Sequence, residues 1–531
     1  MSAKKRVLII GLDGFTWQLG RKFISEGVMP NLAELVKNGS HGNLKSVVPY
    51  ETSPAWSSFQ TGCLPGKTGI FAFHRYDRNR KEVSLNSFEN NAMPSLWELA
   101  SRGGKKVVSL NMPVTSPPPE VNGIIIPGLL CPKLSAETVY PPGAYDRYIK
   151  RAKNYLIVNN DRRETVKEFT EQSIATEQAR CNVTLELMED VDWDIFSVQM
   201  QSSDIMQHKL WWTLDSQARG FEPEQREIAL EFYRECDDII GKIIRAAGPD
   251  VLKFIVSDHG FGPANDSLAL NVWMRQRGYL ELLPKKPESR WKLIKKKIPP
   301  LKLLAMVYGR ARKLFAAKGS APLSGVVDLK HMREVVDFEK TKVLCLGGTA
   351  NVIYINGTIS ERESLSQKIT AELIEDFGAS SQYHVIAKIS TGKEIYGNQI
   401  DEEMLPDLVV EYNDGFGGAR NPVFDSVIRS SLLDGKQRGT HRRNGIFAGN
   451  GPGVNQGTKF DAEIVDIAPT VLAYLGLAVP KHIDGKVLQE LFDKPLDVQY
   501  EQMEFTREVK NKYKDNEQTK VEQQLADLGY I

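Results

Sequence analysis

The chain has 531 residues, a formal net charge of +1 and a hydrophobic share of 41%. This composition is typical of a soluble globular protein, and the balanced charge gives no general attraction to nucleic acid or acidic lipid. The five cysteines form no CxxC pair, which argues against a disulfide framework and against a cysteine zinc site. The apolar run near the N-terminus stops after Ile10, and no later run reaches membrane-spanning length. We therefore expect a cytoplasmic protein without specific nucleic-acid binding.

Short, unalternating apolar runs predict buried parallel strands, and the longer periodic stretches between them predict helices. The predicted strands are Arg6–Ile10, Lys106–Leu110, Asp194–Val198, Leu252–Val256, Leu408–Tyr412 and Ile446–Ala448. The predicted helices are Met29–Asn38, Ser95–Arg102, Arg163–Met188, Pro223–Ala247 and Ile464–Leu475. Strands that alternate with helices indicate an α/β fold, with a mainly parallel central sheet flanked by helices.

Shifts in composition divide the chain into four predicted parts. Residues 1–277 and 346–498 form the two halves of a core, residues 278–345 an inserted basic cap, and residues 499–531 a charged helical tail that docks on the body. Within the cap, residues 284–318 combine many Lys and Arg with apolar side chains. This pattern is typical of a solvated surface insertion, and it also fits an amphipathic lid that contacts a membrane surface or a polyanionic substrate.

The stretch VPYETSPAWSSFQTGCLPGKTGIF, residues 48–71, contains two competing signals. Its GKT resembles a phosphate-cradling P-loop, but only three residues separate Gly62 from Gly66, where the motif needs four. Pro65 also lacks a backbone N–H, which removes one donor from such a cradle. The other signal is a pair of hydroxyls, Thr52 and Ser53, either of which is a candidate nucleophile.

Three predicted strands lead into acidic or histidine side chains. The first strand is followed by Asp13, the third by Asp204 and His208, and the fourth by Asp258 and His259. A single Asp at a strand end is usually a turn former or a helix cap. Because the carboxyl ends of parallel strands meet at one edge of the sheet, we expect these side chains to lie close together.

Clusters of Asp and His suit a pair of divalent cations. Two cations a few ångströms apart can activate a nucleophile and stabilise the leaving oxygen during attack on a phosphate ester. The sequence offers a sixth donor late in the chain, His441 in RGTHRRNG. Mixed Asp and His ligation favours zinc, and less exclusively manganese or iron. The alternative is that each Asp–His pair is a hydrogen-bonded part of the core.

The order of the motifs resembles the alkaline phosphatase superfamily and, within it, the type I phosphodiesterase/nucleotide pyrophosphatase family. The matching motifs are GLDG at Gly11–Gly14, PxxTxP at Pro49–Pro54, TGxxP at Thr61–Pro65, DxxxH at Asp204–His208, SDHG at Ser257–Gly260, GTH at Gly439–His441, GPG at Gly451–Gly453 and the run from Asp466 to Gly485. The resemblance touches nearly the whole chain apart from the basic segment and the tail. It implies an alkaline phosphatase-like fold and a metal-dependent phosphoric ester hydrolase.

Carried onto this sequence, the resemblance implies two metal sites and a nucleophile. One site is held by Asp204, His208 and His441. The other is held by Asp13, Asp258 and His259, together with Thr52. The family spacing favours Thr52 over Ser53 as the nucleophile, and the cations implied are zinc, with manganese or iron as alternatives.

Substrate recognition is less well defined by the sequence. Nucleotide pyrophosphatases of this family place a phosphate-holding Asn at the position of Phe73, so nucleotide preference is open here. Asn111, which also ends a strand, is a candidate substitute, and Arg442 is a candidate phosphate contact or a surface ion-pair residue. The substrate class expected is a small-molecule, lipid or glycan phosphate ester, with peripheral membrane contact through residues 284–318.

Related activities are separated by their nucleophile loops. Sulfatases need a C/S-x-P-x-R stretch, and the sequence after Pro54 is Ala55-Trp56 without an Arg. Cofactor-independent phosphoglycerate mutases use a Ser as the nucleophile. The Thr-containing loop argues against this activity but does not exclude it. We therefore predict a phosphodiesterase. The alternatives are a phosphotransferase or phosphomutase of the same superfamily and a non-catalytic metal-containing binding protein.

Overall fold

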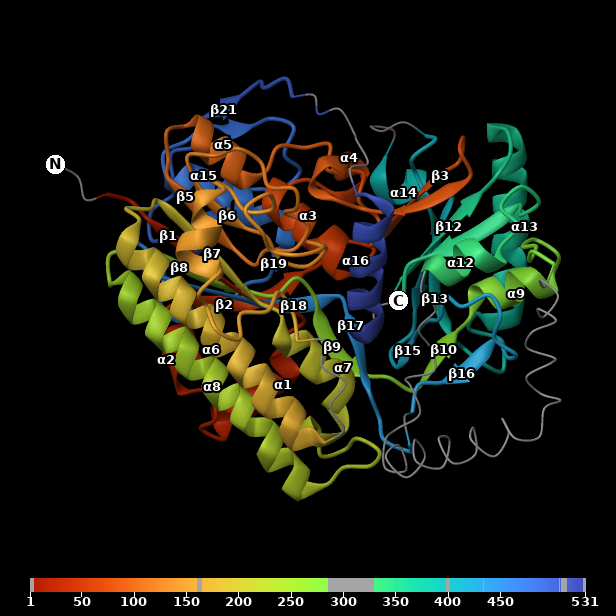
Figure 1. The fold of residues 1–531 in the computed structure, drawn as a ribbon, viewed down its shortest axis with the longest axis horizontal. Helices are drawn as coiled ribbons and strands as arrows, with labels where there is room; N and C mark the ends of the chain where they lie inside the picture. The colour runs from red at the N-terminus through yellow and green to blue at the C-terminus, as the bar shows by residue number, and fades with distance from the viewer. Residues whose placement is uncertain are drawn as a thin grey trace, which may run out of the picture.

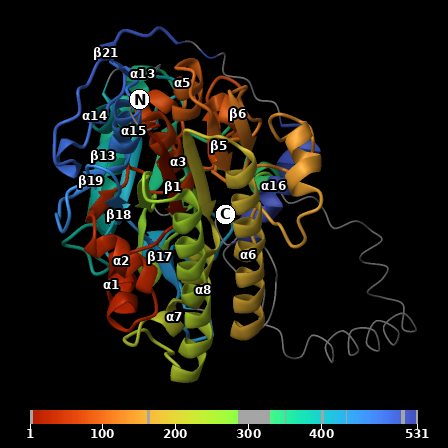
Figure 2. The same ribbon diagram turned by 90° about the vertical axis from the view of Figure 1, so that its left-hand side faces the viewer.

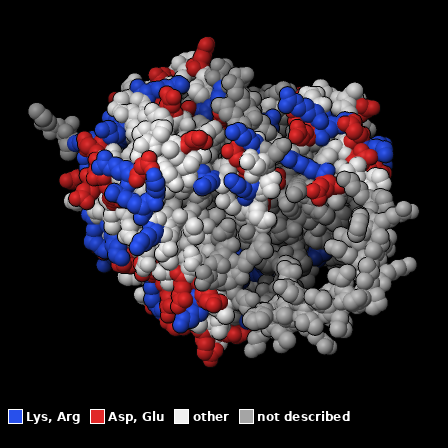
Figure 3. Space-filling view, viewed as in Figure 1, with Lys and Arg blue, Asp and Glu red and all other residues white. Residues whose placement is uncertain are grey.

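The computed structural model describes residues 4–159, 165–284, 329–348, 350–397, 402–432, 434–505, 507 and 513–528. Figure 1 shows a larger lobe and a smaller lobe side by side. On the face in Figure 3, positive and negative side chains are interspersed, and the surface is hollowed between the lobes. Nearly all of the basic segment 284–318 lies outside the described residues, so its lid or membrane role stays a prediction.

The larger lobe is built on an eight-stranded sheet with the order β19-β2-β18-β8-β1-β7-β5-β6. The strands are β1 (Val7–Leu12), β2 (Ser40–Lys45), β5 (Val107–Leu110), β6 (Gly123–Ile126), β7 (Ile195–Met200), β8 (Leu252–Val256), β18 (Asn444–Asn450) and β19 (Ala462–Glu463). The five strands from β8 to β6 are parallel, whereas β18 is antiparallel to both neighbours. The mainly parallel sheet is confirmed, but the parallel direction predicted for Ile446–Ala448 was wrong.

Helices cover both faces of this sheet. Successive side chains of a strand point to opposite faces, so Leu8 and Ile10 enter one hydrophobic core while Val7 and Ile9 enter the other. The first core is covered by α1 (Trp17–Ser25), α2 (Pro30–Lys37), α6 (Val166–Asp190), α7 (Ser202–Leu214) and α8 (Pro223–Ala247). The second is covered by α3 (Thr52–Thr61), α5 (Leu96–Arg102) and α15 (Ile467–Tyr474). The two longest of these helices, α6 and α8, run side by side (Figure 2).

The smaller lobe has its own antiparallel sheet and core. Its sheet has the order β11-β12-β14-β13, with the strands Val343–Leu346, Asn351–Ile355, Leu408–Tyr412 and Ile386–Thr391. Its core also contains side chains from α9 (Leu270–Gln276), α12 (Leu329–Val335), α13 (Ile359–Phe377) and α14 (Gly392–Tyr396). The sequence assigned Leu408–Tyr412 to the parallel sheet, which was wrong. The four predicted parts of the chain stay a prediction, and β11 pairs with β12 across the boundary placed at residue 345.

Several short elements connect these layers. They are β3 (His74–Asp77), β4 (Glu82–Leu85), β9 (Gly260–Pro263), β10 (Asp266–Leu268), β15 (Phe416–Gly418), β16 (Ile428–Ser430), β17 (Gly439–Arg442), β20 (Val479–Pro480), β21 (Tyr500–Glu501), the single-turn helix α4 (Pro65–Thr68) and the short 3-10 or π turns Phe88–Asn90, Tyr145–Ile149, Ile464–Asp466 and Gln489–Leu491.

The GKT lies in α4, where the ammonium of Lys67 donates to the carbonyl oxygen of His482 over 2.7 Å and to Asp484 Oδ1 over 2.5 Å. Lys67 is held by these two contacts, and the rejection of a P-loop stays a prediction.

The last described helix, α16 (Asp515–Leu528), packs against both lobes (Figure 1). Val521, Leu525 and Leu528 are buried in the first core of the larger lobe. The Gln518 side-chain oxygen accepts from the Leu85 N–H over 3.1 Å and from Arg333 Nη2, in α12, over 2.5 Å. Among the described residues, no helix combines the length and apolar character needed to cross a bilayer.

Candidate metal centre

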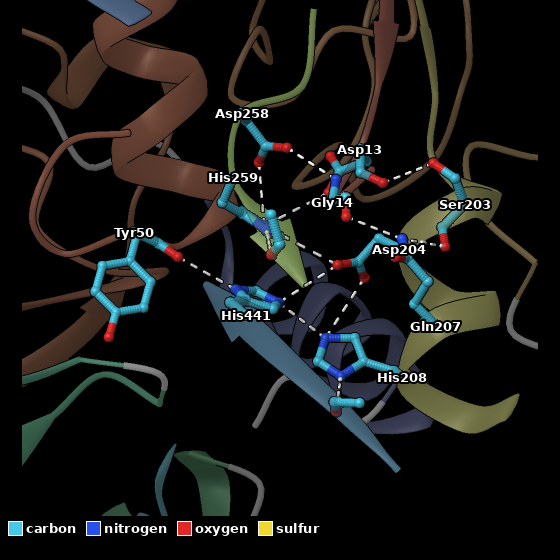
Figure 4. Close-up of polar contacts among 12 residues, drawn as sticks. Asp13, Gly14, Tyr50, Ser203, Asp204, Gln207, His208, Asp258, His259 and His441 are labelled. Atoms are coloured by element: carbon cyan, nitrogen blue, oxygen red, sulfur yellow. Dashed lines mark hydrogen bonds and ion pairs between the residues drawn. The ribbon is translucent and has the colours of Figure 1, made fainter. Parts of the chain in front are cut away.

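The six predicted metal donors lie together at the carboxyl edge of the central sheet (Figure 4). Neighbouring strands β1 and β8 deliver the first donors, α7 follows β7, and β17 pairs with β9 just after β8. The donors are Asp13, Asp204, His208, Asp258, His259 and His441. His208 has a side chain that is 14% exposed, and the other five are buried. The topology rule therefore holds for the five donors that follow β1, β7 and β8, which are those it covered; His441 lies on β17, which is antiparallel to β9.

Two groups of three donors are close enough to hold a cation. Asp204, His259 and His441 form one group, and Asp13, Asp258 and His259 form the other, with the ligand atoms in each lying within 4.8 Å of one another. His259 belongs to both groups. Its Nε2 lies 3.3 Å from Asp258 Oδ2, 3.8 Å from Asp13 Oδ1 and 4.0 Å from Asp204 Oδ1.

His208 joins the first group through its neighbours on both sides. One helical turn separates it from Asp204 on α7, which places the two side chains on one face of the helix. His208 Nε2 lies 3.6 Å from Asp204 Oδ2 and 2.9 Å from His441 Nε2. His441 Nε2 lies 3.3 Å from Asp204 Oδ1.

All three imidazoles face the cluster with the same ring nitrogen. The Nδ1 atoms of His208, His441 and His259 lie 3.3, 3.2 and 3.2 Å from the backbone carbonyl oxygens of Gly439, Tyr50 and Gly260, respectively. A carbonyl can only accept, so each Nδ1 carries a hydrogen, and in a neutral ring the Nε2 lone pair then faces the carboxylates. Burial lowers the pKa of His208 to about 3 and holds the pKa of His259 well below its ordinary value, which keeps these rings neutral. This is the tautomer that a metal-binding histidine needs.

The carboxylates are crowded in a way that a cation would relieve. Burial, together with neighbouring carboxylates, raises the pKa of Asp13 and of Asp258 well above the ordinary value. Among the described residues, Asp13 Oδ1, Asp258 Oδ2 and His259 Nε2 have no hydrogen-bond partner although they are buried. The donor set therefore fits divalent cations by chemistry and by charge.

The GLDG loop is shaped by what packs against its glycines. Gly14 has φ +66°, and a Cβ atom there would lie 2.9 Å from Asp204 Oδ1. Its N–H donates to Asp258 Oδ1 over 3.1 Å. A Cβ on Gly11 would lie 2.6 Å from the indole ring of Trp56. The absence of these two side chains lets both the cluster and the indole approach the strand end.

Asp13 is oriented by two side chains that the sequence did not single out. Its Oδ2 accepts from Trp56 Nε1 over 2.8 Å and from Gln199 Nε2 over 2.6 Å. With Oδ2 saturated in this way, Oδ1 is left to face His259. Gln199 lies near the end of β7, and its place at the end of a predicted strand was the only signal in the sequence that pointed to it. No signal in the sequence pointed to Trp56.

Thr52 is the first residue of α3, and its side chain is buried. Its hydroxyl has no hydrogen-bond partner among the described residues. Two residues earlier, the Tyr50 carbonyl oxygen contacts His441, and one turn later Trp56 binds the first carboxylate of the cluster. Thr52 is therefore held between two attachments to the donor cluster. The Ser53 hydroxyl is equally buried and also without a partner in this part of the structure, so burial does not separate the two candidates.

The predicted substrate residues have other contacts in this structure. Asn111 Nδ2 donates to the Gln199 side-chain oxygen over 3.0 Å, so Asn111 supports the residue that orients Asp13. Arg442 donates to the carbonyl oxygens of His441 and Pro263 over 2.9 and 2.7 Å and pairs with Asp414 at 3.0 Å. Contact of either residue with substrate stays a prediction.

Comparison with known proteins agrees with the motifs. The sequence matches the type I phosphodiesterase / nucleotide pyrophosphatase family over residues 7–379. The chain belongs to this family. The match confirms the resemblance inferred from the motifs, and it supports a phosphoric ester hydrolase with buried Asp and His clusters that suit metal.

A solved structure shares the fold. Human ectonucleotide pyrophosphatase/phosphodiesterase 5 is similar to this member of the family with a TM-score of 0.53 and 12% sequence identity. The similarity covers 92% of this chain and 100% of that one. At this identity the likeness shows the alkaline phosphatase-like fold and no more. The sequence matches no curated protein.

Proposed function

We propose that the protein is a phosphodiesterase that holds two divalent cations and uses Thr52 as its nucleophile. The observation that carries the proposal is the arrangement of three imidazoles whose Nδ1 atoms contact backbone carbonyl oxygens and whose Nε2 atoms face a buried cluster of three carboxylates. In the absence of a proton or a cation, the lone pairs of His208 and His441 would face each other across 2.9 Å. Such a donor set is suited to zinc, with manganese or iron as alternatives.

The residues divide naturally between two cations. Asp204, His208 and His441 would hold one, supported by the short distances among their ligand atoms. Asp13 and Asp258 would hold the other together with His259. When bound, the cations lower the pKa of a coordinated hydroxyl or water and offset the negative charge that develops on the phosphate oxygens.

The reaction requires two displacements at phosphorus. In the first, Thr52 Oγ1 forms a bond to phosphorus as the bond to the leaving oxygen breaks, and the hydroxyl proton passes by way of solvent to the leaving oxygen, which departs as an alcohol. In the second, a water oxygen attacks the phosphothreonine and the bond to Thr52 breaks, which restores the hydroxyl. The buried position of Thr52 at the start of α3 keeps bulk water away from the attacking oxygen. Backbone N–H groups in the first turn of that helix favour an anion in front of it.

The substrate class follows from the family and from the site. Small phosphate esters such as nucleotides fit a family of phosphodiesterases and nucleotide pyrophosphatases. Lipid or glycan phosphate esters and peripheral membrane contact through residues 284–318 remain further proposals, as does the cytoplasmic location. Liposome sedimentation of the full chain and of a variant without residues 285–318 would test the membrane contact, and equal sedimentation would exclude it.

The experiment is metal analysis followed by a substrate screen. Purified protein is loaded with zinc or manganese and assayed on phosphodiesters, phosphomonoesters and sulfate esters. We expect hydrolysis of diesters, loss of turnover in Thr52→Ala and retained turnover in Ser53→Ala. Full turnover in Thr52→Ala would refute the mechanism. Transfer of the phosphoryl group to an added alcohol instead of water would favour a phosphotransferase, and inactivity of every metal-loaded sample would favour a binding protein.

A further inference from the structure

Arg420 reaches from the smaller lobe to the residue that precedes Thr52. It lies two residues after β15 and is 8% exposed. Its Nη2 forms an ion pair with Glu51 Oε2 at 3.6 Å. Glu51 is the N-cap residue of α3, so the guanidinium is placed beside the start of the helix that presents Thr52.

The guanidinium of Arg420 has unused hydrogen-bond donors. Its Nε and Nη1 are buried and have no hydrogen-bond partner among the described residues. The distance of 3.6 Å to Glu51 is that of an ion pair rather than a hydrogen bond. Arg78, another buried arginine, donates instead to the carbonyl oxygens of Ile355 and Leu405 over 3.2 and 2.7 Å. A buried guanidinium with two unsatisfied N–H groups is costly unless a ligand accepts from them.

The surroundings hold Arg420 in place. Asn271 Nδ2 donates to the Arg420 carbonyl oxygen over 2.8 Å and to the Cys345 carbonyl oxygen over 3.0 Å, which ties the backbone at Arg420 to β11. Gly348 leaves room for the guanidinium, because a Cβ atom there would lie 2.9 Å from Arg420 Nη2 and 3.5 Å from Glu51 Oε1. Arg420 is therefore held in place by these backbone contacts and by the space at Gly348, while its Nε and Nη1 make no hydrogen bond of their own.

Among the residues that the structure describes, Glu51 is the carboxylate that pairs with Arg420. His74 is buried, and its Nε2 has no hydrogen-bond partner in the described part of the chain. Burial, with Arg420 and Arg333 nearby, holds the pKa of His74 well below its ordinary value, so the ring is neutral. Phe73, the preceding residue, has an apolar side chain and offers no donor to a phosphate. His74 and Phe73 therefore add no positive charge beside Arg420.

We propose that Arg420 binds the phosphate group that Thr52 attacks, by donating an N–H of its guanidinium to a non-bridging phosphate oxygen. A hydrogen bond from a charged guanidinium to a phosphate oxygen is strong, and an arginine keeps its charge at any working pH. Glu51 orients the guanidinium through Nη2 and leaves the other two donors available. This assignment rests on the proposed phosphodiester hydrolysis and adds to it a residue from the smaller lobe.

The kinetic test compares two buried arginines of the same lobe. Arg420→Gln is expected to lower kcat/KM for bis(4-nitrophenyl) phosphate about 100-fold, since it removes charged donors to the reacting group. The control is Arg362→Gln, because Arg362 is also buried but pairs with Glu403 and Asp407 at 3.4 and 3.6 Å. We expect the control to lower Tm while kcat/KM stays within about twofold of the wild type. A kcat/KM for Arg420→Gln within that same range, or a loss confined to substrates that carry a second phosphate, would overturn the assignment.

A binding measurement separates this inference from the proposed function. Inorganic phosphate is expected to raise the Tm of the metal-loaded wild type and of Arg362→Gln, and to raise that of Arg420→Gln much less. If the wild type hydrolyses no ester but phosphate still distinguishes these variants, the proposed hydrolysis fails, and only phosphate binding by Arg420 is retained. If phosphate raises the Tm of Arg420→Gln as much as that of the wild type, or raises neither, the assignment fails.

Discussion

The indole N–H of Trp56 donates to Asp13 Oδ2 over 2.8 Å, and this contact joins the helix that carries Thr52 to a donor of the candidate metal centre. Trp56 follows Thr52 by about one helical turn and packs against Gly11 on β1. Thr52 and the Asp13 carboxylate are therefore positioned relative to each other by the side chain of Trp56.

Replacement of Trp56 by Phe tests this connection. The variant keeps the aromatic packing but leaves Asp13 with one hydrogen-bond donor fewer at Oδ2. We expect kcat/KM to fall about 10- to 100-fold, as is usual for residues that orient metal ligands. Steady-state kinetics with metal titration would measure it. The matched control is Trp97→Phe, since Trp97 is equally buried but donates to Ser197 at 3.4 Å, and an equal loss in both variants would contradict the interpretation.

The start of α7, which carries Asp204 and His208, is held by a buried carboxylate. Glu177 Oε1 accepts from the Ser202 N–H over 3.0 Å, while its Oε2 pairs with Arg180. Glu177→Gln leaves Arg180 as a buried charge without its partner, and we expect a loss of about 3–5 kcal/mol in the free energy of unfolding.

Glu177→Leu distinguishes the ion pair from the contact at the helix start. The amide oxygen of Gln can still accept from Ser202, whereas Leu cannot. We therefore expect Glu177→Leu to weaken zinc binding more than Glu177→Gln does, as measured by competition with a chelating dye. Equal zinc affinities would show that the contact with Ser202 does not position α7.

Metal removal should destabilise the protein because buried like charges are then left uncompensated. At a zinc concentration 100 times the dissociation constant, binding adds about 2.7 kcal/mol to the free energy of unfolding. We expect a chelator to abolish turnover and lower Tm, and added zinc or manganese to restore both. A Tm that is unchanged by chelation and by added metal would contradict a metal centre at this site.

Asp258→Asn is expected to raise the Tm of the metal-free protein but to reduce the increase in Tm that zinc produces. The amide oxygen can keep the hydrogen bond from the Gly14 N–H, while one negative charge leaves the cluster. Without metal, the variant should melt above the wild type; with zinc, it should gain less than the wild type gains. Calorimetry of both proteins in both states would measure this, and a lower Tm in the metal-free variant would argue against charge crowding.

The helix α16 should contribute to the stability of the whole molecule. Leu525 is fully buried in the first core of the larger lobe, and Leu525→Ala is expected to cost about 2–5 kcal/mol in the free energy of unfolding. Chemical denaturation would measure the loss. Lys520 is exposed on the same helix, and Lys520→Ala should leave the denaturation midpoint close to that of the wild type.

The sequence predicted those features that depend on local pattern and on the topology of parallel sheets. Asp13, Asp258 and His259 were expected at one sheet edge because they follow buried strands, and the structure places them there. The assignment of Leu408–Tyr412 failed because an apolar run that is buried on both sides looks the same in either sheet. The predicted parallel direction of β18 was wrong for a similar reason, since so short an apolar run has the same residue pattern in parallel and antiparallel strands.

The supporting contacts could not be predicted in the same way. Trp56 and Gln199 act on Asp13 from residues 43 and 186 positions away in the chain. Arg420 comes within reach of Glu51 only because the smaller lobe packs beside α3. Pairings of this kind are set by the packing of distant elements, for which one sequence carries no periodic signal.

The position of His259 in both donor groups has a consequence for how the centre fills. Its one available lone pair can be given to a single ion at a time. If an ion took this lone pair from one side, the other side would be completed by His208 or by Thr52, so binding at the two halves would be interdependent. Isothermal titration calorimetry with zinc would then show two unequal binding steps instead of a single class of equivalent sites.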